Sequence, residues 1–153
     1  MGLGKKIRAA LAGVGMAGAL AVSAATPAAA GGVGTLAYPT CQTFQWWPAT
    51  GEGGWVRIPD LNQNYRCQLA YGNQNSGVWA LQVALDRCYA AGLETDGIYG
   101  PLTRQAVRNV QARIGAVVDG EYGPQTGSLM DWPLEFGDGY ACWPSSTWVI
   151  KPW

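Results

Sequence analysis

The octet "DGIYGPLT" at residues 96–103 returns as "DGEYGPQT" at residues 119–126, with six of the eight letters identical. Asp-Gly favours a turn in which the glycine takes a positive φ. Gly-Pro then supplies a permissive cap position followed by proline in the first turn of a helix. Each octet therefore predicts a turn that leads directly into a helix.

Apolar residues recur at helical spacing in three segments, 75–92, 100–115 and 123–132. Ser76 is expected to cap the first helix, while Gly92 and Gly115 are expected to end the first and second. The pattern predicts a mainly α fold, a small three-helix bundle with two Asp-Gly-x-Tyr-Gly-Pro-x-Thr loops. Its expected buried residues are Val78, Leu81, Leu85 and Cys88 on the first helix, Leu102, Ala106, Val107, Val110 and Ile114 on the second, and Leu129 and Met130 on the third.

The flanks have a different texture, with tryptophans scattered among glycines and prolines and no sustained helical period. We therefore expect irregular Trp-rich extensions at residues 31–68 and 133–153, with short strands at most, around a helical domain at 69–132. The indoles either stack on sugar rings or form a satellite core that joins the extensions. They are Trp46, Trp47, Trp55, Trp143, Trp148 and Trp153.

The first 30 residues have the pattern of a secretory signal peptide. Lys5, Lys6 and Arg8 precede an apolar run that ends in "AAA" at residues 28–30. Cleavage there leaves 123 residues with seven basic and ten acidic side chains, a net charge of −3. We expect a secreted monomer, extracellular or associated with the cell wall, that binds neither nucleic acid nor, after cleavage, a membrane.

Histidine is absent from the whole chain. Serine triads, Cys–His nucleophiles and His-ligated zinc hydrolases all require an imidazole, so the sequence excludes them. A pair of carboxylates, as in glycoside hydrolysis, is the catalytic option that remains, and the acidic residues form no convincing pair. We therefore expect no enzymatic activity, no cofactor and no metal.

The four cysteines of a small exported chain predict two disulfides, for which three connectivities exist. We favour Cys67–Cys88 and Cys41–Cys142. Cys67 lies just before the first helix and Cys88 near its end, so the intervening chain could fold back along the helix. The second bridge would then join the two extensions.

Residues 77–130 resemble the peptidoglycan-binding domain of the three-helix type. The matching motifs are Leu81 and Gln82, the octet at 96–103, then Ala106, Val107 and Gln111, and the octet at 119–126. The resemblance implies a compact bundle that binds cell-wall peptidoglycan non-covalently, usually beside a wall-active enzyme. This chain has no recognisable catalytic domain, so a separate wall-active enzyme is an expected partner.

We expect glycan and stem peptide to be recognised reversibly in a shallow groove beside the Asp-Gly loops. Two other functions stay open: a small carboxylate-dependent wall hydrolase, and a secreted protein-interaction or inhibitor module. The octets themselves are read mainly as helix-start devices, with Asp96, Gly97, Gly100, Asp119, Gly120 and Gly123 as structural loop residues. The candidate ligand contacts are Tyr99, Thr103, Tyr122, Thr126, Trp79 and Trp132.

Overall fold

The structure is a computed structural model that describes residues 37–49 and 53–144. All of these residues belong to one compact unit, Thr35–Trp153, and Met1–Gly34 is a separate unit. The predicted signal peptide at 1–30, Trp148 and Trp153 therefore lie outside the described residues.

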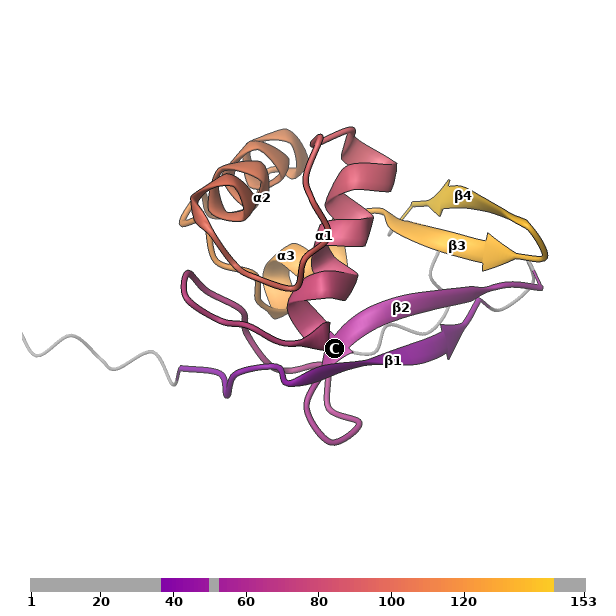
Figure 1. Cartoon of the computed structure of the whole chain (residues 1–153), viewed down its shortest axis with the longest axis horizontal. Helices are drawn as coiled ribbons and strands as arrows, with labels where there is room; N and C mark the ends of the chain where they lie inside the picture. The colour runs from indigo at the N-terminus through magenta and orange to yellow at the C-terminus, as the bar shows by residue number, and fades with distance from the viewer. Residues whose placement is uncertain (1–36, 50–52, 145–153) are drawn as a thin grey trace, which may run out of the picture. The chain divides into compact units, whose positions relative to one another are not determined.

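Four strands form one antiparallel sheet in the order β1-β2-β3-β4 (Figure 1). Two come from each side of the helices: β1 (Thr43–Pro48) and β2 (Trp55–Asp60), then β3 (Trp132–Phe136) and β4 (Gly139–Trp143). The two hairpins join where Trp55 of β2 lies opposite Glu135 of β3. The prediction of a mainly α three-helix bundle with irregular flanks is therefore wrong.

The sheet was missed because its strands are short and are rich in residues that usually break strands. Pro59 lies within β2, a central strand, where a proline removes a ladder hydrogen bond. Only Trp55 and Val56 of β2 pair with β3, however, so Pro59 lies where the strand has β1 as its single neighbour. The pairing of β2 with β3 joins segments far apart in the sequence, which local periodicity does not reveal.

Three helices lie in the predicted segments: α1 (Ser76–Tyr89), α2 (Pro101–Ile114) and α3 (Pro124–Leu129). Gly100 and Gly123 are the N-caps of α2 and α3, and each is followed by proline at the first helical position. Gly115 ends α2 in the left-handed conformation, with φ 71°. Local turn chemistry therefore sets these boundaries.

The boundaries of α1 differ from the prediction. Asn75, rather than Ser76, is its N-cap, because the Asn75 side chain accepts a hydrogen bond from the backbone nitrogen of Val78 at 3.1 Å. The helix ends at Tyr89, and its C-cap is Ala90 rather than Gly92, with Ala90 in the left-handed conformation at φ 53°.

The predicted buried faces are largely correct, but two leucines lie outside. Leu102 is 74% exposed and Leu129 is 38% exposed. In the first turn of α2 the inward position belongs to Thr103, whose hydroxyl is hydrogen-bonded in the interior. At the end of α3 the side chain that points into the core is that of Met130, which is fully buried.

Two disulfides form, as expected, but the predicted pairing was wrong. Cys41 is bonded to Cys67 and Cys88 to Cys142, with Cα–Cα distances of 5.0 and 5.5 Å. The chain before α1 does not fold back along the helix. It runs beside the chain before β1, where the Cys41 backbone nitrogen donates to the carbonyl of Gln68 at 2.9 Å. Cys88 in the last turn of α1 is thereby left to bond with Cys142 of β4.

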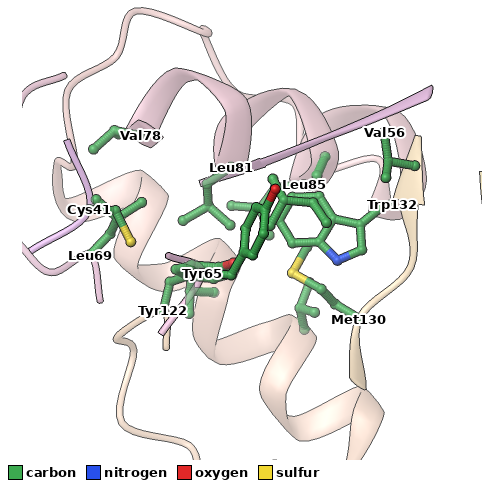
Figure 2. Packing of buried hydrophobic residues seen from close by; sticks show 14 of the residues in the cluster. Cys41, Val56, Tyr65, Leu69, Val78, Leu81, Leu85, Tyr122, Met130 and Trp132 are labelled. Carbon is green, nitrogen blue, oxygen red and sulfur yellow. The ribbon is translucent and has the colours of Figure 1, made fainter. Parts of the chain in front are cut away.

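The core lies between α1, the sheet and the α3 region. Figure 2 shows Leu81 and Leu85 of α1 packed close to Trp132 of β3, with Tyr122 and Met130 nearby. All five side chains are at most 1% exposed. Helix α1 packs against β1, β2 and β3 as well as α2, so helices and sheet share one core.

Within residues 37–49 and 53–144, no helix is both long and apolar enough to cross a membrane. In the same part of the chain, no cluster of three or more His, Cys, Asp or Glu residues is placed to hold a metal ion.

Candidate functional site

A buried glutamine of α1 holds the first Asp-Gly loop. The Gln82 side-chain nitrogen lies 2.8 Å from Asp96 Oδ1, 3.0 Å from the Ile98 carbonyl and 3.1 Å from Thr103 Oγ1. Its oxygen accepts a hydrogen bond from the Gly97 backbone nitrogen at 2.8 Å. With Gln82 only 1% exposed, these contacts join the loop to the helix before it and the helix after it.

Gln111 of α2 makes the same four contacts with the second loop. Its nitrogen lies 2.7 Å from Asp119 Oδ1, 2.8 Å from the Glu121 carbonyl and 3.1 Å from Thr126 Oγ1. Its oxygen accepts from the Gly120 backbone nitrogen at 2.9 Å. Each copy of the octet is therefore held in place by one buried glutamine.

The two glutamines belong to the motifs noted in the sequence, but sequence reasoning gave them no role. A signal was present, because Gln82 and Gln111 each lie four residues after a buried valine, on the apolar face of the helix. A polar side chain on such a face must find internal partners. The loop backbone and the octet side chains are those partners.

The glycines of the two turns have the backbone conformation that Asp-Gly requires. Gly97 and Gly120 both have a φ of 75°. Asp96 and Asp119 each accept a hydrogen bond from the backbone nitrogen two residues ahead, at 2.9 and 2.8 Å. The two loops are thus closed by identical Asx turns.

The octet tyrosines point into the core. Tyr99 and Tyr122 are fully buried, and burial raises the pKa of both phenols above the usual value. Tyr99 donates to the carbonyl of Gly120 at 3.0 Å, so the ring of the first octet supports the second loop. Tyr122 lies edge-on to Trp132, with ring centroids 6.0 Å apart.

Of the six side chains predicted to contact a ligand, Trp79 alone reaches the surface. Trp132 is fully buried and its indole nitrogen donates to the carbonyl of Gly127 at 3.0 Å. The side chains of the other five are almost wholly buried in this structure. The five that are at most 4% exposed are Tyr99, Thr103, Tyr122, Thr126 and Trp132.

A shallow cavity of about 400 Å³ lies beside the first Asp-Gly loop and contains Trp79. We call it the loop groove, defined by Gln74, Asn75, Ser76, Trp79, Asp96, Gly97 and Ile98. Hydrogen bonds from the Ile98 backbone nitrogen and the Gln82 amide hold the pKa of Asp96 below its usual value. The groove therefore presents an indole, an apolar side chain and an exposed carboxylate.

Trp79 connects the loop groove to the sheet. The Arg57 guanidinium carbon lies 4.6 Å from the ring centroid of Trp79 and 5.0 Å from that of Trp46, so the cation contacts both rings. Phe44 lies 5.6 Å from Trp79 and 6.1 Å from Trp46, centroid to centroid. We call Trp79, Arg57 and Trp46 the aromatic ladder.

A second cavity, of about 340 Å³, lies between the end of α1 and one face of α2. Its lining includes Tyr89, Leu102, Gln105, Asn109 and Arg113, and we call it the helix groove. Its polar groups already have partners within the protein, since Gln105 donates to Asn109 at 2.9 Å and the Arg113 guanidinium lies 5.4 Å from the Tyr89 ring.

No curated protein and no solved structure gave a match in searches with this chain. One protein family did match: residues 74–130, which contain all three helices, both Asp-Gly loops and the whole loop groove, fit the family model described as putative peptidoglycan binding domain.

Proposed function

We propose that this protein is exported and binds peptidoglycan non-covalently through the loop groove, without cleaving it. The observation that carries the proposal is the family match over residues 74–130, because the loop groove is built entirely from that segment. Peptidoglycan offers sugar rings and short peptides, and the groove has groups suited to both.

The chemistry of the groove supports recognition of such a polymer. The Trp79 indole can stack on the apolar face of a sugar ring. The Asp96 carboxylate is exposed and, since its pKa is lowered, is an acceptor for sugar hydroxyls and peptide N–H groups at neutral pH. Ile98, 43% exposed, adds an apolar wall.

A binding role without catalysis agrees with the absence of histidine and with the surroundings of Asp96 and Glu135, the carboxylates of the loop groove and of the sheet. Histidine is absent, and Asp96 is held as an acceptor rather than as a proton donor. Glu135 is ion-paired with both Arg57 and Arg87. A wall hydrolase that uses two carboxyl groups needs one of them protonated to act as general acid, and neither of these groups has such surroundings.

Sedimentation of the purified protein with insoluble peptidoglycan tests the proposal. Trp79→Ala and Ile98→Ala should each weaken retention, Trp79→Ala by roughly tenfold if about 1.4 kcal/mol of stacking is lost. Ile98→Ala leaves the loop contacts in place, because Ile98 bonds to Gln82 and Asp96 through its backbone. Leu102→Ala, in the helix groove, is the matched control and should bind as the wild type does.

Three results would overturn the proposal. Absence of retention by the wild-type protein would remove peptidoglycan as the ligand and favour a protein partner, which cross-linking would identify. A loss confined to Leu102→Ala would move the site to the helix groove. Release of soluble fragments from the same wall preparation, abolished by replacing one acidic residue, would show a hydrolase.

A further inference from the structure

A cavity of about 470 Å³ lies at one end of the sheet, outside the segment that matches the family model. It is lined by Trp46, Trp55, Glu135, Phe136 and Gly137, which we call the sheet pocket. The three aromatic side chains are 47%, 51% and 47% exposed, respectively. Three large rings that remain half in water at one place indicate a binding surface rather than a core.

The sheet register separates these rings from the tryptophans of the core. Trp46 lies opposite Arg57, and Trp55 lies opposite Glu135, so their side chains share one face with the ion pair. The adjacent Trp47 points to the other face, where its ring packs edge-on against Tyr65 at 5.2 Å between centroids. The flanking tryptophans therefore divide between the two surroundings: Trp47 packs against the core, whereas Trp46 and Trp55 are half exposed.

A single carboxylate in the pocket adds a polar group of defined character. Arg57 Nη2 and Arg87 Nη1 both donate to Oε1 of Glu135, Arg87 at 2.5 Å. Among the described residues, the other oxygen, Oε2, accepts no hydrogen bond from the protein and can accept one from a ligand. With two guanidinium groups beside this one carboxylate, the pocket is not strongly acidic, and a polycation is a poor fit.

A site that binds a neutral sugar needs apolar rings beside a hydrogen-bond acceptor, and the sheet pocket has both. The C–H face of the sugar stacks on an indole while its hydroxyls donate to the carboxylate. An acyl chain would take Glu135 Oε2 out of water without offering it a hydrogen-bond donor, which is costly. The geometry therefore favours a carbohydrate over a lipid.

The aromatic ladder links the sheet pocket to the loop groove. Trp46 lines the sheet pocket, Trp79 lines the loop groove, and Arg57 contacts both rings, so the aromatic ladder bridges the two. The two ring centroids are no farther apart than about 10 Å, the sum of their distances from the guanidinium carbon. Consecutive sugars of one strand can span this separation.

We propose that the sheet pocket is a second subsite for the glycan strand, so that the protein recognises a run of several sugars across the loop groove and the sheet. This inference rests on the proposed function, because the strand it extends is the peptidoglycan glycan. It assigns binding to β1, β2, the end of β3 and the β3–β4 turn, which the family match does not include.

Calorimetry with peptide-free glycan strands of defined length tests the second subsite. The wild-type protein should bind a long oligosaccharide at least tenfold more tightly than a disaccharide. Trp55→Ala should abolish most of this difference while leaving disaccharide affinity unchanged. Phe136→Ala, which removes a ring from the same pocket at the end of β3, should act in the same direction and remains informative if Trp55→Ala destabilises the hairpin.

Tyr71→Ala is the matched control, because Tyr71 is an aromatic side chain 61% exposed and outside both cavities. If the wild-type protein binds neither glycan strands nor whole peptidoglycan, the proposed function fails and the second subsite fails with it. If Trp79→Ala loses glycan binding while Trp55→Ala and Phe136→Ala match the control at every length, the second subsite alone is refuted. Equal affinity of the wild type for short and long strands would also refute it.

Discussion

Replacing Gln82 with methionine tests whether the buried glutamine holds the first loop. Methionine has a similar length but cannot supply the amide, so all three donated contacts and the bond from Gly97 are lost. The buried Gly97 N–H loses its acceptor, at a cost of roughly 1–3 kcal/mol. Thr103 can still donate to the Ile98 carbonyl at 3.3 Å, and Asp96 can turn to water, which limits the remaining loss.

The expected destabilisation is therefore about 3 kcal/mol, a large share of the 5–15 kcal/mol typical of a domain. Urea unfolding followed by tryptophan fluorescence, with the disulfides intact, measures it. Gln111→Met should cost about the same, because Gln111 makes the same four contacts. Gln105→Met, on the exposed face of α2, should stay within about 0.5 kcal/mol of the wild type. If Gln82→Met and Gln105→Met were equally mild, the reasoning would be refuted.

Three other changes probe the loops, a disulfide and a buried acid. Gly120→Ala should cost at least about 1 kcal/mol more than Gly115→Ala in thermal unfolding, since both glycines have positive φ but a Cβ at Gly120 would lie 2.9 Å from an arginine side chain. Removing Cys88–Cys142 by a double serine replacement should cost about 4 kcal/mol in the chain-entropy account, and peptide mapping of the unreduced protein should recover this pair. Burial raises the pKa of Asp60 above its unfolded value, so its ionisation destabilises the fold and stability is regained as pH falls through the folded pKa. Asp60→Asn should be at least as stable as the wild type at pH 7 and should lack that regain, and identical pH profiles for the two proteins would contradict the assignment.

The features that the sequence predicted correctly depend on a few neighbouring residues. Gly100 and Gly123 before proline start α2 and α3, and Gly115 ends α2, because a cap or a left-handed residue is required within one turn of the boundary. The predicted N-cap of α1 was wrong by a single residue, Ser76 in place of Asn75. Asn75 and Ser76 are both good caps, and tertiary contact decides between them, since the Asn75 amide also donates to the carbonyl of Cys41 at 2.9 Å.

The sheet and the disulfides could not be predicted in this way. The three helices lie between Trp55 and Glu135 in the sequence, and no local pattern records that register. The disulfides follow from the same arrangement, because the strands decide which cysteines approach one another. Cys88 and Cys142 are adjacent since α1 packs against β3 and β3 pairs with β4.

The candidate site could be predicted only in part. Composition identifies aromatic residues that suit sugar binding, but the direction of each side chain is set by tertiary packing. Tyr99 and Trp79 were equal candidates in the sequence, and the structure buries the first and leaves the second at the surface. The sheet pocket was beyond reach, because its residues come together only through strand pairing.

The position of α1 has a consequence for how this segment can be moved between proteins. A segment that is to fold in another protein must bury its own apolar side chains. The apolar face of α1, however, is covered by strands that come before and after the matched segment in the sequence. Cut out alone, residues 74–130 would keep both octets and lose Val56, Ile58 and Trp132, which belong to the same buried cluster as Leu81 and Leu85. We therefore expect a graft of residues 74–130 alone to be less stable than a graft that also includes the two hairpins.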